Sequence, residues 1–152
     1  HTDNPIGADR MRGHREDLTK IQNMHLSHIT DRPSIATITS DNKEIDIHVE
    51  IANNPSAIMH GLMHRTYLPW DSGMVFLFNN MTTDGFWMRN TLIPLSIAFW
   101  DSEGRIIDIK DMEPQSDKII RPADLYKGAI EVNQGFFEFH NIKIGDTITV
   151  IE

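Results

Sequence analysis

Two runs of alternating apolar and polar residues, SIATITS and EIDIHVEIA, lie between Ser34 and Ala52 on either side of the trio DNK. Alternation with a period of two directs one side of an extended strand to a core and the other side to water. Asp, Asn and Lys between two such runs favour a tight turn. The segment is therefore predicted to be a β-hairpin, and this pattern constrains the fold of the chain more than any other.

Further strand-like segments follow the hairpin. The apolar run GMVFLF has the length of a buried strand, and the turn DSEG between LIPLSIAFW and RIIDIKDM predicts a second hairpin. GAIEVNQ and ITVIE complete the set, and the turn-forming pair Gly145-Asp146 introduces the last of them. Because strands outnumber helices and hairpin turns dominate, we predict a mainly β (α+β) fold: a small antiparallel β-barrel or folded sheet with one or two short helices.

Helical segments are few. NNPSAIMHGLMHR predicts a short helix from about Pro55 to His64, because an asparagine precedes a proline at the first helical position and apolar side chains follow at helical spacing. GFFEFHN predicts one more turn of helix. The polar segment EPQSDKIIRPADLY, with its two prolines, is predicted to be a surface loop of the kind that borders sites.

The first 33 residues differ in character from the rest. They are polar, show no sustained period, and are interpreted as an N-terminal arm with a short helix near Glu16 to Met24. Residues 34–152 are predicted to form a single β-rich domain.

Composition excludes several classes of partner and chemistry. The 22 acidic and 14 basic residues give a net charge of −8 with no strong basic cluster, so nucleic acid is not an expected partner. The absence of cysteine excludes disulfides and thiolate chemistry. No apolar run approaches the roughly 20 residues that a bilayer crossing needs, so no membrane span is expected in the chain as given.

The stretch GFWMRNTLIPL is an apolar run with Arg89, Asn90 and Thr91 at its centre. As a strand, it would mix apolar and polar side chains on both sides. In one interpretation Arg89 is solvated, and Asn90 and Thr91 satisfy backbone groups at a bulge or turn. In the other, Trp87, Arg89 and Asn90 line a cleft in which the aromatic ring supplies contact area and the polar groups orient a ligand. The residues alone leave both interpretations open.

Five motifs occur in a defined order along the chain: GLMHR, SGMVFLF, FWMRNTLIPL, AIEVNQG and IKIGD. Together they resemble the DUF192 family, a widespread group of bacterial and archaeal proteins of uncharacterised function, over about Ile45 to Ile151. The resemblance implies that the following positions are strongly kept in the family: Gly61, Leu62, Met63, Arg65, Gly73, Met74, Trp87, Met88, Asn90, Thr91, Pro94, Leu95, Glu131, Gly135, Gly145 and Asp146.

The resemblance favours a functional role for the central stretch without naming a ligand. The candidate ligand-binding residues are Met63, Arg65, Trp87, Arg89, Asn90, Thr91 and Glu131. Arg89 stands where the family more often has lysine, and Ser96 replaces an acid that usually follows the Pro-Leu pair. If that acid were a catalytic base or a metal ligand in relatives, this chain would lack it.

Some of these residues also have structural interpretations. Arg65 and Glu131 are the natural candidates for an ion pair between the helix and the late strand, and such a pair inside a fold is often structural. Gly73, Gly135 and Gly145 are interpreted as backbone devices, where a side chain would clash or a positive φ is needed.

Histidines and methionines suggest a second kind of site. His60 and His64 are four residues apart on the predicted helix, and Met63 lies beside them. Imidazole and thioether ligands suit Cu(I), so these three residues are an alternative soft-metal site. The other interpretation is that the methionines fill the core and the histidines are exposed.

Three functional hypotheses follow. The first is a small accessory protein that binds an unidentified small molecule or protein partner. The second is an uncharacterised hydrolase or transferase in which Glu131 is the general base and Arg89 and Asn90 stabilise negative charge. The third is a copper-binding protein that uses the methionine and histidine site. The resemblance also implies an extracytoplasmic, for example periplasmic, location as an expectation.

Overall fold

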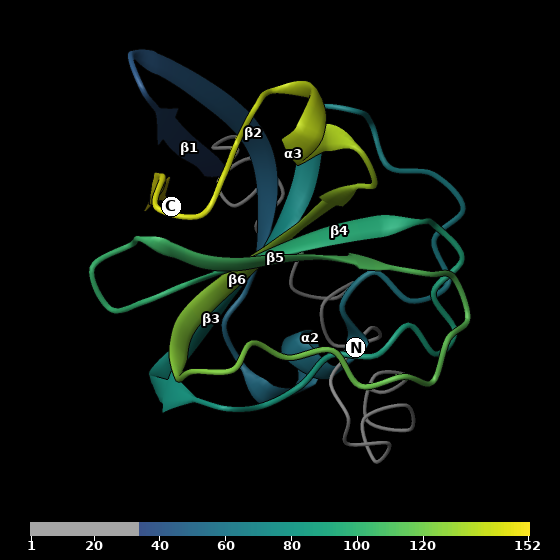
Figure 1. Cartoon of the computed structure of the whole chain (residues 1–152). Helices are drawn as coiled ribbons and strands as arrows, with labels where there is room; N and C mark the ends of the chain where they lie inside the picture. Colours follow the sequence, from purple (N-terminus) through teal and green to yellow (C-terminus); the bar gives the residue numbers. More distant parts are fainter. Residues whose placement is uncertain (1–33) are drawn as a thin grey trace, which may run out of the picture.

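The computed structural model of the chain describes residues 34–152, in which strands predominate (Figure 1). The elements are β1 (Ser34–Ser40), β2 (Lys43–Ala52), α2 (Pro55–His60), β3 (Ser72–Thr82), β4 (Leu95–Trp100), β5 (Ile106–Met112), β6 (Tyr126–Asn133), α3 (Phe136–Phe139) and β7 (Thr147–Ile151). All the strands join one seven-stranded sheet in the order β5-β4-β6-β3-β2-β1-β7. The prediction of a mainly β fold with short helices is confirmed. Neither helix has the length or the hydrophobicity that crossing a membrane requires.

Both predicted hairpins are present. β1 pairs with β2, and β4 with β5, in antiparallel register across the DNK and DSEG turns. One pairing departs from the antiparallel pattern, because β2 and β3 run parallel, with His48 opposite Ser72. A parallel pair needs a crossover connection rather than a tight turn. Here the connection holds α2 and the loop that leads to β3.

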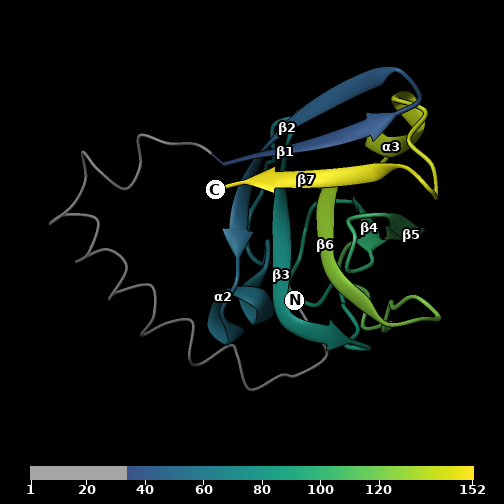
Figure 2. The ribbon, with the colours of Figure 1, turned by 90° about the vertical axis from the view of Figure 1, so that its left-hand side faces the viewer.

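The sheet curls into a half-barrel. Its two edge strands approach each other where Arg105 bridges to Thr147, and the N–H of Ile148 donates to the carbonyl of Gly104 at 2.8 Å. At this corner the residues that precede β5 bond to the start of β7. Figure 2 shows β1 and β7 crossing the direction of β3 and β6, as expected for a strongly curled sheet.

Each side of the sheet carries its own core. Along β3 the side chains alternate: Val75 joins one cluster, while Met74 and Phe76 join the other. The Val75 cluster includes Ile148 of β7 and Ile106 of β5. Because it unites residues from both edges of the sheet, it lies on the concave side, and we call it the inner core. Phe136 and Phe137 of α3 also belong to this inner core.

The convex side of β3, β6 and β4 is covered by α2 and by three loops. We call the loops 61–71, 83–94 and 113–125 the outer layer. Leu62, Phe86, Met88 and Ile93 of these loops are buried against Phe76 and its neighbours in the outer core. The outer layer is therefore packed by apolar side chains, although long parts of it have no regular structure.

Helix α2 is shorter than predicted. Its start agrees with the sequence, since the side chain of Asn54 accepts a hydrogen bond from the N–H of Ala57 at 2.9 Å. It ends at His60 rather than at His64, because Gly61 adopts a positive φ of 52° and breaks the helical path. The predicted helix of residues 16–24 lies outside the described residues, as does the whole arm of residues 1–33.

The central stretch is a loop as far as Pro94, and only its last residue, Leu95, belongs to a strand. The sheet-like contact of this loop is the bridge from Phe86 to Ile120, and Asn90 turns the chain with a φ of 57°. Pro94 precedes β4, which lies between β5 and β6 and is not an edge strand. A proline is tolerated there because it stands outside the hydrogen-bonded ladder.

Candidate functional site

The candidate residues from the sequence gather in and beneath the outer layer. Met63, Trp87 and Thr91 are buried there, whereas Arg89 and Asn90 are exposed on its surface. Their place follows from apolar packing, because the neighbours of Trp87 along the chain, Phe86 and Met88, both belong to the outer core.

Trp87 and Arg89 form a stacked pair. The guanidinium carbon of Arg89 lies 4.0 Å from the centroid of the Trp87 ring, and its Nε donates to Oδ1 of Asp117 at 3.0 Å. Arg89 and Asp117 are both largely exposed, so their ion pair contributes little stability. The indole ring is 7% exposed, and within residues 34–152 its Nε1 has no hydrogen-bond acceptor.

Asn90 and Thr91 serve the backbone of the outer layer. The carbonyl of Asn90 accepts from the N–H of His64 at 2.8 Å, and the carbonyl of Thr91 accepts from the N–H of Gln115 at 3.0 Å. The hydroxyl of Thr91 donates to the carbonyl of Arg89 at 3.2 Å. The backbone carbonyls of these two residues therefore join the three loops to one another, and the side chain of Thr91 satisfies a backbone group.

Glu131 lies on β6, beneath the outer layer. It is fully buried on the convex side of β6, with Met74 and Ile97 as its neighbours on the adjacent strands. The prediction that Arg65 forms its ion pair with Glu131 is wrong, because both terminal nitrogens of Arg65 bond to the carboxylate of Glu50 on β2. A contact between residues 15 positions apart, on a loop and a neighbouring strand, leaves no local signal in the sequence.

Arg65 helps to line a cleft at the rim of the outer layer, which we call the outer cleft. Its volume is about 260 Å³. The lining residues are His48, Val49, Glu50, Arg65, Tyr67, Leu68, Pro69, Ser72 and Gly73. Gly73 is needed for the close approach of the strands, because a Cβ there would lie 2.4 Å from the carbonyl oxygen of Glu131. Of the sequence candidates, Arg65 is the one that the outer cleft includes.

The charges of the outer cleft balance each other. Nη2 of Arg65 lies 2.7 Å from Oε1 of Glu50, and this hydrogen bonding raises the pKa of Arg65 despite its partial burial. Both side chains still expose a third or more of their surface, at 36% and 53%. The cleft thus presents a fixed donor and a fixed acceptor side by side, which can bind a group that both donates and accepts hydrogen bonds.

A second cavity lies where the half-barrel is not closed by strands, and we call it the seam cavity. It measures about 270 Å³ and is lined by Ser96, Ile109, Asp111, Gly135, Phe137, Glu138 and Ile142. The buried hydroxyl of Ser96 donates to Oδ1 of Asp111 at 2.8 Å. Where the resemblance expects an acid, this chain therefore has a serine bonded to a carboxylate of the neighbouring strand.

Sequence reasoning missed Asp111 because of an irregular register. With Trp100 opposite Ile106, an unbroken pairing would set Ser96 opposite Lys110. The shift between Phe99 and Trp100 moves the pairing by one residue and sets Ser96 opposite Asp111. Asp111 is exposed, but it also lines the seam cavity.

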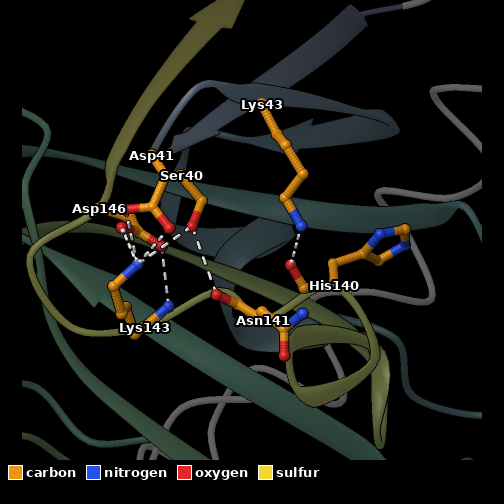
Figure 3. A network of polar contacts seen from close by, with 7 residues as sticks. All are labelled: Ser40, Asp41, Lys43, His140, Asn141, Lys143 and Asp146. Carbon is orange, nitrogen blue, oxygen red and sulfur yellow. Dashed lines mark hydrogen bonds and ion pairs between the residues drawn. The ribbon is translucent and has the colours of Figure 1, made fainter.

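A polar network at the barrel end joins the β1–β2 turn to the loop before β7 (Figure 3). Asp146 accepts from the backbone N–H of Lys143 at 2.8 Å, and Nζ of Lys143 lies 3.4 Å from both Asp146 and Asp41. Ser40 donates to the carbonyl of Asn141 at 3.3 Å. Burial alone would raise the pKa of Asp146, but the backbone hydrogen bond and the positive charge of Lys143 outweigh it and lower that pKa. We call these residues the barrel-end network.

The predicted soft-metal site has two nearby imidazoles. The ring centroids of His60 and His64 lie 6.0 Å apart, and Met63 between them in sequence is buried. In the part of the chain that the structure describes, no three His, Cys, Asp or Glu side chains are placed to hold a metal together. The geometry thus gives the histidine pair no additional ligand of these types.

Comparisons with other proteins agree with this architecture. The family model DUF192, described as "Uncharacterized ACR", matches residues 36–150. A crystal structure of a protein of unknown function from Novosphingobium aromaticivorans is 31% identical, with a TM-score of 0.73 over 80% of this chain and 89% of that chain. A putative transcription regulator from Sinorhizobium meliloti is also 31% identical, with a TM-score of 0.74 over 78% of this chain and 92% of that chain. A comparison with curated proteins found no match.

Proposed function

The chain belongs to the DUF192 family, and from this premise we propose that it is a small binding protein whose outer cleft accepts one side chain of an extended segment of a partner protein. The observation that carries the proposal is the outer cleft itself, with the Arg65–Glu50 pair on one wall and Tyr67 at its rim.

The size of the cleft favours a single side chain over a whole small molecule. Its volume of about 260 Å³ lies below the range of about 300–1,000 Å³ that is common for small-molecule pockets. The rest of the contact area would come from the surroundings of the cleft. Tyr67 is 73% exposed and Trp70 is 46% exposed on the same loop. Exposed aromatic residues are enriched at protein interfaces and supply much of their binding energy.

The polar wall favours an uncharged, amide-bearing group. Arg65 and Glu50 already neutralise each other, so a charged side chain would repel one of them. A carboxamide, or a peptide group of an extended chain, can accept a hydrogen bond from Arg65 and donate one to Glu50. Asparagine and glutamine are accordingly the side chains that match this wall.

In this proposal the other candidate residues have supporting roles. Met63, Trp87 and Thr91 hold the outer layer in place through burial and backbone bonds, which fixes the loop that carries Arg65 and Tyr67. Arg89 lies on the exposed surface of the same layer.

Selection from a phage-displayed library of random peptides, with the full chain immobilised, tests the proposal. We expect the chain to select peptides that contain asparagine or glutamine, whose affinity is then measured by fluorescence polarisation with synthetic copies. Tyr67→Ala should weaken this affinity about tenfold or more, as removal of an aromatic anchor commonly does. Glu50→Gln should weaken it as well, because it removes the carboxylate acceptor.

Leu125→Ala is the matched control, since Leu125 is 52% exposed but lies outside the cleft. It should leave the affinity unchanged. The proposal fails if no peptide is selected. It also fails if Tyr67→Ala, like the control Leu125→Ala, binds the selected peptides as tightly as the original chain does. Circular dichroism of each variant shows whether the fold is retained.

A further inference from the structure

The seam cavity exists because a helix, rather than a strand, fills the gap in the half-barrel. β5 and β7 meet near Arg105 and Thr147 and then diverge, and α3 with its following loop occupies the space beside β5. The cavity lies between this segment and the strands β4 and β5. It is separate in its lining from the outer cleft, with which it shares no residue.

The floor of the seam cavity is apolar. Phe137 is 3% exposed and Ile142 is 6% exposed, and both belong to the inner core. Ile109 packs against the same cluster from β5. A short hydrocarbon group that entered the cavity would therefore exchange water for contact with an existing core, and such burial of apolar surface is favourable.

The polar part of the lining is acidic. Asp111 on β5 and Glu138 on α3 each contribute a carboxylate, and the seven lining residues that the structure assigns to this cavity include no Lys, Arg or His. Ser96 uses its proton to bond Asp111, so its oxygen retains lone pairs that can accept another hydrogen bond. The seam cavity thus offers three oxygen acceptors beside an apolar floor.

We propose that the seam cavity binds a primary alkylammonium group that carries a short apolar chain. An ammonium group has three N–H donors and one positive charge, which matches the carboxylates of Asp111 and Glu138 and the hydroxyl oxygen of Ser96. The attached chain lies on Phe137 and Ile142. The same chemistry occurs in a free small amine and in the lysine side chain of another protein, and the two sources are distinguished by experiment.

The test compares ligands that share a chain and differ in charge. The ¹⁵N-labelled full chain is titrated at neutral pH with butylamine, butanol and butyrate, and separately with a capped Gly-Lys-Gly peptide. We expect butylamine, the peptide or both to shift the amide signals of residues 96, 109, 111 and 135–142, whereas butanol and butyrate do not. A response to butylamine alone identifies a free amine as the ligand, and a response to the peptide alone identifies a lysine side chain.

Net charge requires a control, because a chain of charge −8 attracts any cation weakly. Asp111→Asn and Glu138→Gln should each weaken binding of the responding ligand about tenfold, as expected for loss of a charge-assisted hydrogen bond. Asp108→Asn makes the same change of charge on the same strand, but Asp108 does not line the cavity. It should leave the affinity within about twofold of the original, since screening at about 0.15 M salt removes most of the long-range attraction.

Two results would overturn the proposal. The first is that neither butylamine nor the peptide shifts the amide signals, or that butylamine and butanol shift them equally. The carboxylates would then have no role in binding. The second is equal weakening by Asp108→Asn and Asp111→Asn, since binding would then reflect net charge alone. Neither result bears on the outer cleft, whose test uses different variants and different ligands.

Discussion

The outer layer and the barrel end hold their loops in place by different means. In the outer layer, Phe86 and Met88 are buried in the outer core, Trp87 between them is also buried, and the charged groups Arg65 and Arg89 are paired at the surface. At the barrel end, Asp146 is itself buried and is held by the backbone N–H and the ammonium group of Lys143. The first arrangement rests on burial, whereas the second rests on the charge of one carboxylate.

Because of this difference, the two cavities should respond differently to a fall in pH. The stability contributed by apolar burial changes little with pH, whereas that of a bonded carboxylate depends on its ionisation. The outer cleft, which the outer layer supports, should therefore keep its shape in mild acid. The loop before β7, which continues from Ile142 of the seam cavity to Asp146, should loosen there first.

The largest effect is expected for Trp87→Ala in the outer layer. Truncation of a buried tryptophan typically lowers the free energy of unfolding by about 3–5 kcal/mol, because it removes apolar contacts and leaves a cavity. Urea denaturation of the full chain, followed by circular dichroism, measures the loss.

Trp70→Ala is the matched comparison, because Trp70 is 46% exposed and contacts the buried ring of Phe136 and the exposed ring of Phe139. Trp70→Ala should lower the free energy of unfolding by about 1 kcal/mol, which is the range of an aromatic contact at a partly exposed site. If the two substitutions lowered the free energy of unfolding equally, the outer layer would not be held by burial of Trp87, and the contrast with the barrel end would disappear.

The next effect in size is expected for Asp146→Asn in the barrel-end network. The folded state lowers the pKa of Asp146, so its stabilisation is present above the ordinary aspartate pKa and is lost as the pH falls through the lower folded pKa. At pH 7 the substitution should lower the free energy of unfolding by about 1.5–3 kcal/mol, which is typical of a hydrogen bond to a charged group. The difference between the two proteins should shrink below about pH 4, where the original aspartate begins to protonate in the unfolded chain.

Asp41→Asn tests whether burial is what matters in this network. Asp41 contacts the same lysine at 3.4 Å, but its side chain is 79% exposed. An exposed ion pair contributes about 0–1 kcal/mol, so this substitution should have a small effect at every pH. A loss for Asp41→Asn as large as that for Asp146→Asn, or a loss for Asp146→Asn that stays constant with pH, would contradict the role assigned to the buried carboxylate.

Local patterns in the sequence predicted the fold class well, because hairpins and caps depend on neighbours in the chain. The alternation around the DNK turn yielded β1 and β2, and Asn54 with Pro55 marked the start of α2. The central stretch was mistaken for a strand, since its apolar residues pack as a covering loop and Asn90 turns the chain. Composition alone does not distinguish a buried loop from a buried strand.

The candidate site was harder to predict, because it depends on pairs that are distant in sequence. Arg65 was expected to pair with Glu131, but its partner is Glu50 on β2, the strand that pairs in parallel with β3. Asp111 reaches Ser96 only because the register of β4 and β5 shifts by one residue. Such registers arise from the packing of the whole sheet, and one sequence holds no direct record of them.

The smallest effect is expected at two asparagines, one in each region. Asn90 in the outer layer and Asn141 at the barrel end both have a φ of 57°, and the carbonyl of each accepts a hydrogen bond from another segment, namely from His64 and Ser40. Alanine tolerates this left-handed conformation poorly, so each Asn→Ala substitution should cost about 1 kcal/mol, whereas each Asn→Gly substitution should cost a few tenths at most. Thermal denaturation of the four variants measures the costs.

Because the strain lies in the backbone, we expect the cost of Asn→Ala to be the same at the two positions, both at pH 7 and at pH 4. The effect of Asp146→Asn, in contrast, changes between these pH values. The cost of Asn141→Ala could instead depend on pH while the cost of Asn90→Ala stays constant. The backbone at the barrel end would then be coupled to the ionisation of Asp146. The two regions would in that case differ in backbone conformation as well as in side-chain chemistry.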